Sequence, residues 1–585
     1  MMKEFDEKIP DPKEIEKEIS DFIAKKFGGN VKIASHFVLP EEVNVEKSDQ
    51  AAPKKKKINF NLKPEELVSY LDQYIVKQDN AKAVLATKIC THFNRIKRLE
   101  DSNDEAEDLV GGIKSNVLMI GPTGVGKTYI IKLIAKKIGV PFVKGDATKF
   151  SETGYVGGDV EDLVRDLVRE ADDDIEVAQY GIIYIDEIDK IASSRNLIGA
   201  DVSRTGVQRA LLKPMEETDV EMKVPHDPIS MIQEIDQFRK TGKRNSRTVN
   251  TKNILFIMSG AFNELIPIIR KRISIQSIGF SASFSNPEET EDILKHVSSE
   301  DLIEMGFESE FVGRLPVRTV FEKLTKDDLF EILKNPNNPI ILGKKLDFAA
   351  YDIEAKFDDN ALRLLAEHAF SENTGARGLV SAVEKALLVF EKKLPSTNID
   401  RFPINEKVIK NSEQSLNELI ASPDDPSYSE AFHTMLKNEE TYIENYLELN
   451  KNDLSDKHNL TLTPLRIHLA AQFYAKHILD IGKVINRIKF YCDEIKKMEL
   501  DFFKIHNINI VLEDDAIDFI LEQFIASPMN FDDFYKTLTT RMTEDFKDGL
   551  ALLKEKTEQK RFFISRESLL DPIAFLNRQI KDELS

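Results

Sequence analysis

The stretch NVLMIGPTGVGKTYIIKLIAKKI, residues 116–138, runs from an apolar segment through a glycine-rich loop into a helical pattern. Its centre, GPTGVGKT, has the glycine, four residues, then Gly-Lys-Thr of a phosphate-binding loop, in the strand–loop–helix context that such a loop requires. Backbone N–H groups of this loop would face phosphate, with charge from Lys127 and a magnesium ligand from Thr128. The residues predicted to bind nucleotide here are Gly121, Pro122, Thr123, Gly124, Val125, Gly126, Lys127 and Thr128.

A second apolar run, GIIYIDE at 181–187, ends in two carboxylates. In an open α/β sheet such a strand brings its C-terminal tip close to the phosphate loop. We expect Asp186 to hold Mg2+ through water, and Glu187 to orient the attacking water as a general base. The alternative for Asp186 is a plain helix N-cap.

The bulk properties limit the class of protein. A chain of 585 residues exceeds what one core can hold, so about three or four domains are expected. Its formal net charge of -20 argues against nucleic acid as a partner. No apolar run reaches the roughly 18–20 residues of a membrane helix, and the N-terminus lacks the apolar core of a signal peptide, which predicts a cytoplasmic protein without membrane contact. Cys90 and Cys492 are expected to be buried, reduced thiols.

Composition and periodicity divide the chain into four parts. Apolar strand-like runs alternate with helical patterns in the second part, which predicts a parallel α/β domain, and the later parts are mainly helical. The predicted parts are an N-terminal helix with a basic linker at 1–60, a large domain at 61–325, a small domain at 326–420, and an extension at 421–585.

The extension carries two further signals. Apolar residues at spacings of three, four or seven over 463–507 predict one long amphipathic helix, which Gly482 weakens. Aligning Ala361 with Ala516, and Arg401 with Arg561, suggests a degenerate second small domain at about 508–575. Because the identity of the two stretches is low, a chance echo stays open as the alternative.

The motifs and their order resemble those of ClpX-type AAA+ unfoldases, with HslU as a near relative, from about Leu62 to Leu394. The resemblance implies a P-loop AAA+ large domain, a helical small domain, ATP and Mg2+ as cofactors, and a homohexamer. The segment LDQYIVKQDNAK resembles the family's adenine-contacting segment, so Tyr74, Ile75 and Val76 are expected to pack against the base. Lys77 stands where the family usually has glycine, which puts the local turn in doubt.

Three polar residues match the family's sensors of nucleotide. Ser259, in ILFIMSGAF, resembles the first sensor, and Arg314, in EFVGRLP, resembles the arginine finger that reaches the neighbouring subunit's γ-phosphate. Arg377, in TGARGL, resembles the second sensor, which touches nucleotide bound to its own chain. The same count in the internal repeat reaches Asp532, so the second copy is predicted to bind no nucleotide.

Three loops match the family's contacts with proteins. TGYVGGDVED resembles the first pore loop, in which Tyr155 and Val156 would grip substrate. Arg239 and Lys240 lie at the spacing of a basic pore-entrance loop, and an ordinary solvated loop is the alternative. The tripeptide Ile278, Gly279 and Phe280 resembles the loop that docks on ClpP, against the alternative of an anchor folding onto its own domain.

The resemblance therefore implies an ATPase that unfolds tagged proteins, threads them through a hexameric pore and delivers them to a ClpP-type peptidase, with no peptidase activity of its own. A protease-independent remodelling chaperone is the alternative. With only two cysteines, the chain lacks the four-cysteine zinc domain of ClpX, and the large insertion of HslU is also missing. Substrate and adaptor choice therefore does not follow from the resemblance.

Overall fold

The structure is a computed structural model. It describes most of the chain from residue 60 onward, and no helix in that part is both long and apolar enough to span a bilayer. The described ranges are 60–101, 114–150, 158–192, 202–222, 248–276, 293–423, 425–556 and 561–584.

A parallel sheet organises the large domain. Its strands follow the order β2-β3-β6-β1-β7, and all four pairs of neighbouring strands are parallel. The central strands are buried along their whole length, as expected for strands covered on both faces. The bounds are β1 Val117–Ile120, β2 Phe142–Asp146, β3 Ile182–Asp186, β6 Leu255–Gly260 and β7 Val317–Val320.

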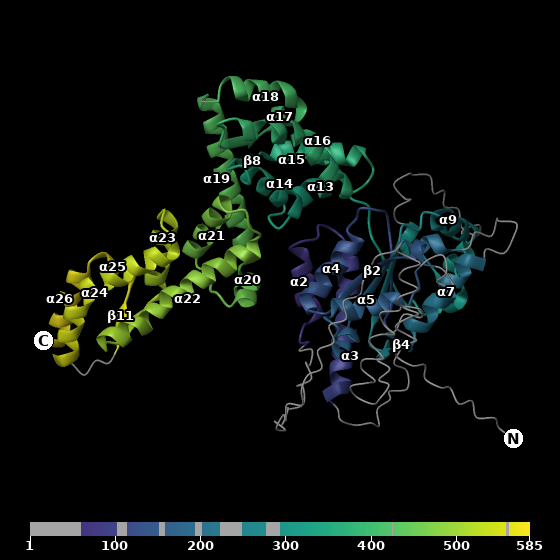
Figure 1. Ribbon diagram of the computed structural model, residues 1–585, viewed down its shortest axis with the longest axis horizontal. Coiled ribbons are helices and arrows are strands. Elements are labelled where there is room, and N and C mark those ends of the chain that lie inside the picture. Colours follow the sequence, from purple (N-terminus) through teal and green to yellow (C-terminus); the bar gives the residue numbers. More distant parts are fainter. Residues whose placement is uncertain are drawn as a thin grey trace, which may run out of the picture. The chain divides into compact units, whose positions relative to one another are not determined.

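Helices cover both faces of this sheet (Figure 1). Along β1, Val117 and Met119 pack into one core and Leu118 and Ile120 into another, as the alternation of side chains along a strand requires. The first core also takes α2 (Pro64–Asp72), α3 (Asp79–Asp101) and α4 (Lys127–Ile138). The second takes α5 (Asp162–Glu170), α7 (Val202–Met215), α9 (Leu265–Gln276), α11 (Ser299–Met305) and α12 (Ser309–Gly313). The predicted α/β fold class is confirmed.

A helical small domain follows. Thr325 caps its first helix by accepting a hydrogen bond from the Asp328 N–H, and the Asp328 carboxylate accepts one from the Thr325 N–H. Its two short strands, β8 (Glu354–Phe357) and β9 (Arg401–Ile404), pair in parallel. Its helices are α13 Lys326–Lys334, α14 Pro339–Ala349, α15 Asp359–Ser371, α16 Arg377–Lys393, α17 Glu406–Lys410 and α18 Ser412–Ala421.

The extension is mainly helical, as predicted, but the single long helix over 463–507 is wrong. That stretch forms two helices, because Asp480 accepts a hydrogen bond from the Lys483 N–H and begins a new helix. Gly482 then lies in the first turn of that helix. The elements are α19 Pro426–Leu449, α20 Lys451–His458, α21 Pro464–Lys476, α22 Ile481–His506, β10 Ile510–Leu512, α23 Asp514–Ala526, α24 Phe531–Lys556, β11 Phe562–Ile564, α25 Arg566–Leu570 and α26 Pro572–Leu584.

Two segments share one order of elements. The run β8, α15, α16, β9, α17 has its counterpart in β10, α23, α24, β11, α25, and both strand pairs are parallel. The Asp358 N–H donates to the Ile404 carbonyl, and the Glu513 N–H donates in the same way to the Ile564 carbonyl. The element order is what an internal repeat would produce.

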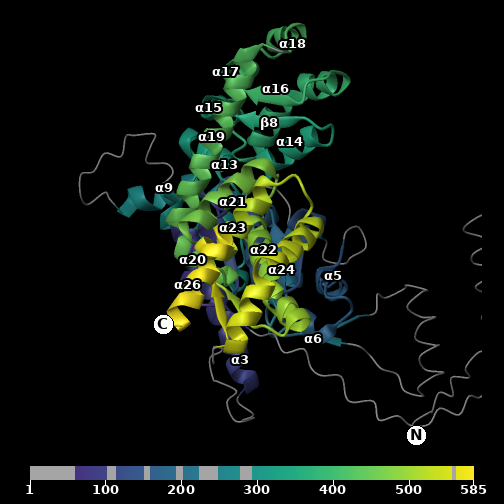
Figure 2. The same ribbon diagram turned by 90° about the vertical axis from the view of Figure 1, so that its left-hand side faces the viewer.

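A buried ion cluster joins the small domain to α19, which packs against β8 and β9 (Figure 1, Figure 2). Glu439 accepts hydrogen bonds from Lys345 and, at 2.8 Å, from Lys356, which also donates to the Ala475 carbonyl at 2.5 Å. Although burial alone would raise the pKa of Glu439, the two ammonium groups hold it below its ordinary value. Cys90 and Cys492 are buried free thiols, as predicted.

Candidate nucleotide site

The phosphate-binding loop connects β1 to α4 with glycines in conformations that other residues rarely adopt. Gly126, with φ 92°, precedes the first residue of α4, and a Cβ there would meet no atom within 4 Å. Gly124, with φ 77°, lies so close to the small domain that a Cβ would sit 2.1 Å from the Thr374 carbonyl oxygen. Its own carbonyl accepts a 2.8 Å hydrogen bond from the Ala376 N–H. The phosphate-binding loop therefore packs directly against the small domain.

Lys127 is buried with its ammonium group folded back onto the loop. Its Nζ donates to the carbonyls of Gly121 at 2.6 Å and Pro122 at 2.8 Å. Burial lowers the pKa of Lys127 to about 8, against the opposing effect of Asp186 and Asp189. Asp186 and Asp189 offset the burial of this ammonium group only in part, and phosphate oxygens would supply further negative charge beside it.

A polar network lies at the C-terminal ends of β3 and β6. Ser259 donates to Asp186 at 2.6 Å, and the Tyr184 hydroxyl lies 2.6 Å from the Ser259 hydroxyl and 3.0 Å from that of Thr128. Although burial would raise the pKa of Asp186, hydrogen bonds from Ser259 and Lys144 hold it below its ordinary value. Burial raises the pKa of Tyr184 to about 12. Asp186 is thus an anion and Tyr184 a neutral hydroxyl at neutral pH.

Glu187 begins the turn after β3 in a left-handed conformation, with φ 57°. Such a conformation is strained for a residue with a side chain, and such strain clusters at functional sites. Its N–H donates to Asp186 Oδ1 at 3.1 Å, while its exposed side chain lines the same cavity as Lys127. This placement suits a group that acts on a water molecule.

The predicted adenine segment makes a left-handed turn at Lys77, although Lys77 stands where the family usually has glycine. Lys77 has φ 60° and Gln78 has φ 65°, so both adopt the left-handed conformation. The buried Gln78 side chain fixes this turn by exchanging hydrogen bonds of 2.7 and 2.8 Å with the backbone of Glu322. Lys77 donates to the Lys323 carbonyl and to Asp328. These contacts compensate for the strain that glycine would avoid.

Residues of the phosphate-binding loop, the tip of β3 and the predicted adenine segment line one cavity of about 520 Å³, a size that suits a small ligand such as a nucleotide. The small domain contributes Asn335, Asn338 and Arg377 to its wall. Oxygen atoms of Thr128 and Asp186 are the hard ligands that Mg2+ prefers when phosphates complete its coordination. The predicted residues that line the cavity are Tyr74, Ile75, Val76, Thr123, Gly124, Val125, Gly126, Lys127, Thr128, Asp186, Glu187 and Arg377.

Sequence reasoning missed several residues of this site. Tyr184 links Thr128 to Ser259, and its signal was a single hydroxyl-bearing side chain within the aliphatic strand IIYID. Lys144, which pairs with Asp186 at 2.9 Å, gave no sequence signal. Asn335 and Asn338 lie in the turn between α13 and α14, outside the motifs that resemble the family.

Arg314 is not among the residues that line this cavity. Its side chain is 48% exposed and pairs with Glu216 at 2.5 Å, so it lies at the surface of the chain. Other predicted contacts with proteins lie outside the described residues. These are Tyr155, Val156, Arg239, Lys240, Ile278, Gly279 and Phe280.

An open parallel sheet, a phosphate-binding loop after β1, an acidic tip on β3 and an arginine from a helical small domain define a P-loop ATPase of the AAA+ class. The comparisons agree. Residues 113–318 match the family described as AAA domain (Cdc48 subfamily), and residues 324–390 match the C-terminal, D2-small domain of ClpB protein.

Curated relatives narrow the class further. The chain is 40% identical over 354 residues to the "ATP-dependent Clp protease ATP-binding subunit ClpX" of Treponema denticola, a match that covers 60% of this chain and 81% of that protein. It is 41% identical over 336 residues to the protein of the same name from Borrelia duttonii, covering 57% and 75%. The chain belongs to the ClpX family of AAA+ proteins, and is an ATP-dependent chaperone of the Clp class.

Proposed function

We propose that this chain is a protein unfoldase that hydrolyses ATP in a homohexamer, threads polypeptides through the central pore and delivers them to a ClpP-type peptidase. The observation that carries the proposal is the contact between the phosphate-binding loop and the small domain. Gly124 touches Thr374 and bonds to Ala376, and Arg377 lines the same cavity. A change at the phosphates is thereby passed to a second domain, which is how hydrolysis would become movement.

Each polar group of the site has a proposed part in hydrolysis. Lys127 binds the outer phosphates, Arg377 senses them, and Glu187 acts as general base on the attacking water. Thr128 and Asp186 hold Mg2+, which when bound neutralises charge on the phosphate oxygens. Ser259 orients Asp186 through its 2.6 Å hydrogen bond.

Arg314 acts between subunits in this proposal. Its exposed side chain would leave Glu216 and reach the γ-phosphate bound to a neighbouring subunit, where such an arginine is worth roughly 10³–10⁵ in rate. The site is complete only in an oligomer, which supports the homohexamer.

The contacts with substrate and peptidase are proposed from the resemblance to the family. Tyr155 and Val156 would grip substrate, and Arg239 and Lys240 would make the pore entrance attractive to acidic or carboxylate-ended tails. Ile278, Gly279 and Phe280 would dock on the peptidase, where several weak loops act together. Peptide cleavage would belong to that partner and not to this chain.

The experiment mixes the full chain, ATP, a tagged folded fluorescent protein and the ClpP-type peptidase of the same source. Wild type should abolish the fluorescence, and Glu187→Gln, which keeps the shape of the base and removes its charge, should not. Unfolding by Glu187→Gln at the wild-type rate would contradict the ATP-driven mechanism.

Phe280→Ala tests delivery in the same assay. It should slow degradation at an unchanged ATPase rate. Degradation as fast as that by wild type would favour the protease-independent remodelling chaperone.

We also propose that the segment at about 508–575 is a degenerate second small domain. The shared element order and the matching hydrogen bonds to Ile404 and Ile564 support it. At the position of Arg377 the second copy carries Asp532, whose charge repels phosphate. The second copy therefore packs or recruits partners and binds no nucleotide.

A further inference from the structure

A buried polar cluster connects the extension to the adenine side of the nucleotide cavity. It consists of Gln73, in the turn after α2, Asn337, in the turn between α13 and α14, and Ile481, the first residue of α22. Gln73 and Asn337 are each 7% exposed and Ile481 is 1% exposed. Three segments far apart in the sequence therefore share one interior.

Asn337 uses both ends of its amide in this cluster. Its Oδ1 accepts a 3.1 Å hydrogen bond from the backbone N–H of Ile481. Its Nδ2 donates to the Gln73 carbonyl at 3.1 Å and to the hydroxyl of Tyr446, on α19, at 3.3 Å. Two of its three partners belong to the extension, so the position of this amide depends on how the extension docks.

Gln73 has a second bond to the extension. Its side-chain Oε1 accepts from Lys457, on α20, at 3.3 Å, and its carbonyl also accepts from Asn335 at 3.1 Å. On α21, the Tyr474 hydroxyl donates to the Pro336 carbonyl at 3.1 Å. Every helix from α19 to α22 thus holds one of the two turns.

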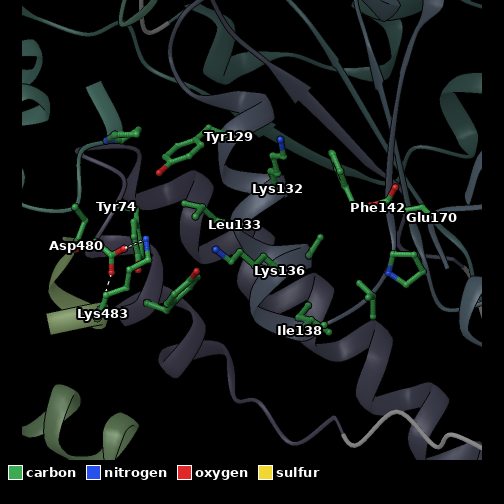
Figure 3. Close-up of a pocket in the computed structure, with 18 of the residues that line it drawn as sticks. Tyr74, Tyr129, Lys132, Leu133, Lys136, Ile138, Phe142, Glu170, Asp480 and Lys483 are labelled. Carbon is green, nitrogen blue, oxygen red and sulfur yellow. Dashed lines mark hydrogen bonds and ion pairs between the residues drawn. The ribbon is translucent and has the colours of Figure 1, made fainter. Parts of the chain in front are cut away.

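The same two turns form the adenine-side wall of the nucleotide cavity. Tyr74 follows Gln73 directly, and Asn335 and Asn338 flank Asn337 on either side; all three line the cavity. Tyr74 and Tyr129 also line a second, larger cavity of about 1700 Å³, together with residues of the extension. Figure 3 shows both tyrosines in that cavity with Asp480 and Lys483 of the extension, so only one layer of side chains separates the extension from the nucleotide site.

We propose that Gln73 and Asn337 are positioning residues for the adenine base, and that docking of α20–α22 and binding of ATP stabilise each other. A partner that bound the extension would then tune the ATPase. The coupling is reciprocal: a docked extension tightens ATP binding by the same factor by which ATP tightens docking. The inference deepens the proposed function at its ATP site, but its test measures binding and needs no unfolding activity.

Ile481→Pro tests the central bond, because it removes the one N–H that Asn337 accepts. Ile481 is the first residue of α22, where proline is favoured, and Asp480 already has the extended backbone that a residue before proline needs, with ψ 157°. The matched control is Ile481→Val, which trims the same buried side chain and keeps the N–H.

The readout compares ATP with inorganic tripolyphosphate in the full chain. Ile481→Pro should weaken binding of a non-hydrolysable ATP analogue about 5- to 20-fold relative to Ile481→Val, within the usual range of coupling between sites. Tripolyphosphate affinity should be equal in the two variants, because the phosphate-binding loop is untouched. Equal ATP affinity in the two variants would overturn the inference.

Hydrogen exchange gives the reciprocal measurement. ATP analogue should increase amide protection in α20 and the first turns of α22 in wild type and Ile481→Val, and should do so less in Ile481→Pro. Protection that does not respond to nucleotide in wild type would also overturn the inference.

Lys457→Met decides the case in which Ile481→Pro loses tripolyphosphate as well, a sign of general damage. It keeps most of the side-chain stem and removes the charge, with its bond to Gln73 and its 4.9 Å contact with the Tyr70 ring. Selective loss of ATP supports the coupling, and wild-type affinity contradicts it. Intact coupling in a protein that fails to unfold substrate would count against the proposed function alone.

Discussion

The turn before α16 and the turn before α24 follow helices of the same length, since α15 and α23 each have 13 residues. In the first turn, Gly375 has φ 62° and a Cβ there would lie 2.8 Å from the Gly124 carbonyl oxygen. In the second turn, Asn530 takes the glycine's place and Phe531 packs against Tyr491 and Phe524 at ring distances of 5.0 and 5.1 Å.

This difference shows that the order of elements alone does not decide whether a turn can fit against a phosphate-binding loop, because a few residues in the turn decide it. One turn fits against a phosphate-binding loop because its backbone can approach closely and because Arg377 follows it. The other turn has bulky aromatic side chains in its own core and presents Asp532 at the start of a helix. In our proposal, the same order of elements supports nucleotide sensing in one place and packing in the other.

The largest expected effect comes from breaking the ion cluster that joins the small domain to α19. Glu439→Ala leaves Lys345 and Lys356 without their shared carboxylate, and loss of one partner from a buried cluster costs about 3–5 kcal/mol. Urea unfolding followed by far-UV circular dichroism measures it, since the chain has no tryptophan.

The matched control is Glu444→Ala on the same helix. Glu444 pairs with a half-exposed His468, and such a surface pair is worth at most about 1 kcal/mol. Equal shifts for the two variants would mean that the buried cluster does not hold the two parts together.

Exchanging the charge of the two turns gives the next largest effect. Arg377→Asp puts the second copy's residue into the nucleotide cavity and should lower the ATPase rate about 10²–10³-fold, the usual cost of losing one group that stabilises developing charge. Asp532→Arg should leave the rate unchanged. A loss of activity in Asp532→Arg would show that the second copy also faces a nucleotide.

The sequence predicted the parts of this site that are local. Lys127 and Asp186 are recognised because each lies in a short contiguous motif, the phosphate-binding loop for Lys127 and an apolar strand end for Asp186. Ser259 was found by resemblance. Tyr184 and Lys144 were missed because their partners are chosen by the sheet register, which pairs β2 with β3 and β3 with β6.

The fold shows the same limit. Strand–helix alternation predicted the large domain, whereas the break before α22 depends on one capping side chain, Asp480, which the apolar periodicity of 463–507 concealed. The cluster of Gln73, Asn337 and Ile481 had no sequence signal. Its central bond joins a backbone N–H, which every residue but proline has, to an amide 144 residues away.

The smallest expected effect is a dependence of ATP affinity on pH. The same measurement also gives the number of nucleotides that each chain binds. Lys127 has its pKa lowered to about 8 by burial, with a further contribution from Arg377, and phosphate would raise this pKa again. Below pH 8 the amine is already charged, so affinity should not change through Lys127. Above pH 8 binding takes up one proton, and affinity should fall with rising pH by at most tenfold per unit.

Isothermal titration calorimetry between pH 7 and 9.5, in buffers of different ionisation enthalpy, measures both the affinity and the protons taken up. With only the first copy facing nucleotide, each chain should bind one ATP analogue and take up no more than one proton. Lys127→Arg, which stays charged throughout this range, should remove the pH dependence. A stoichiometry of two, or a slope that persists in Lys127→Arg, would contradict the division of roles between the two copies.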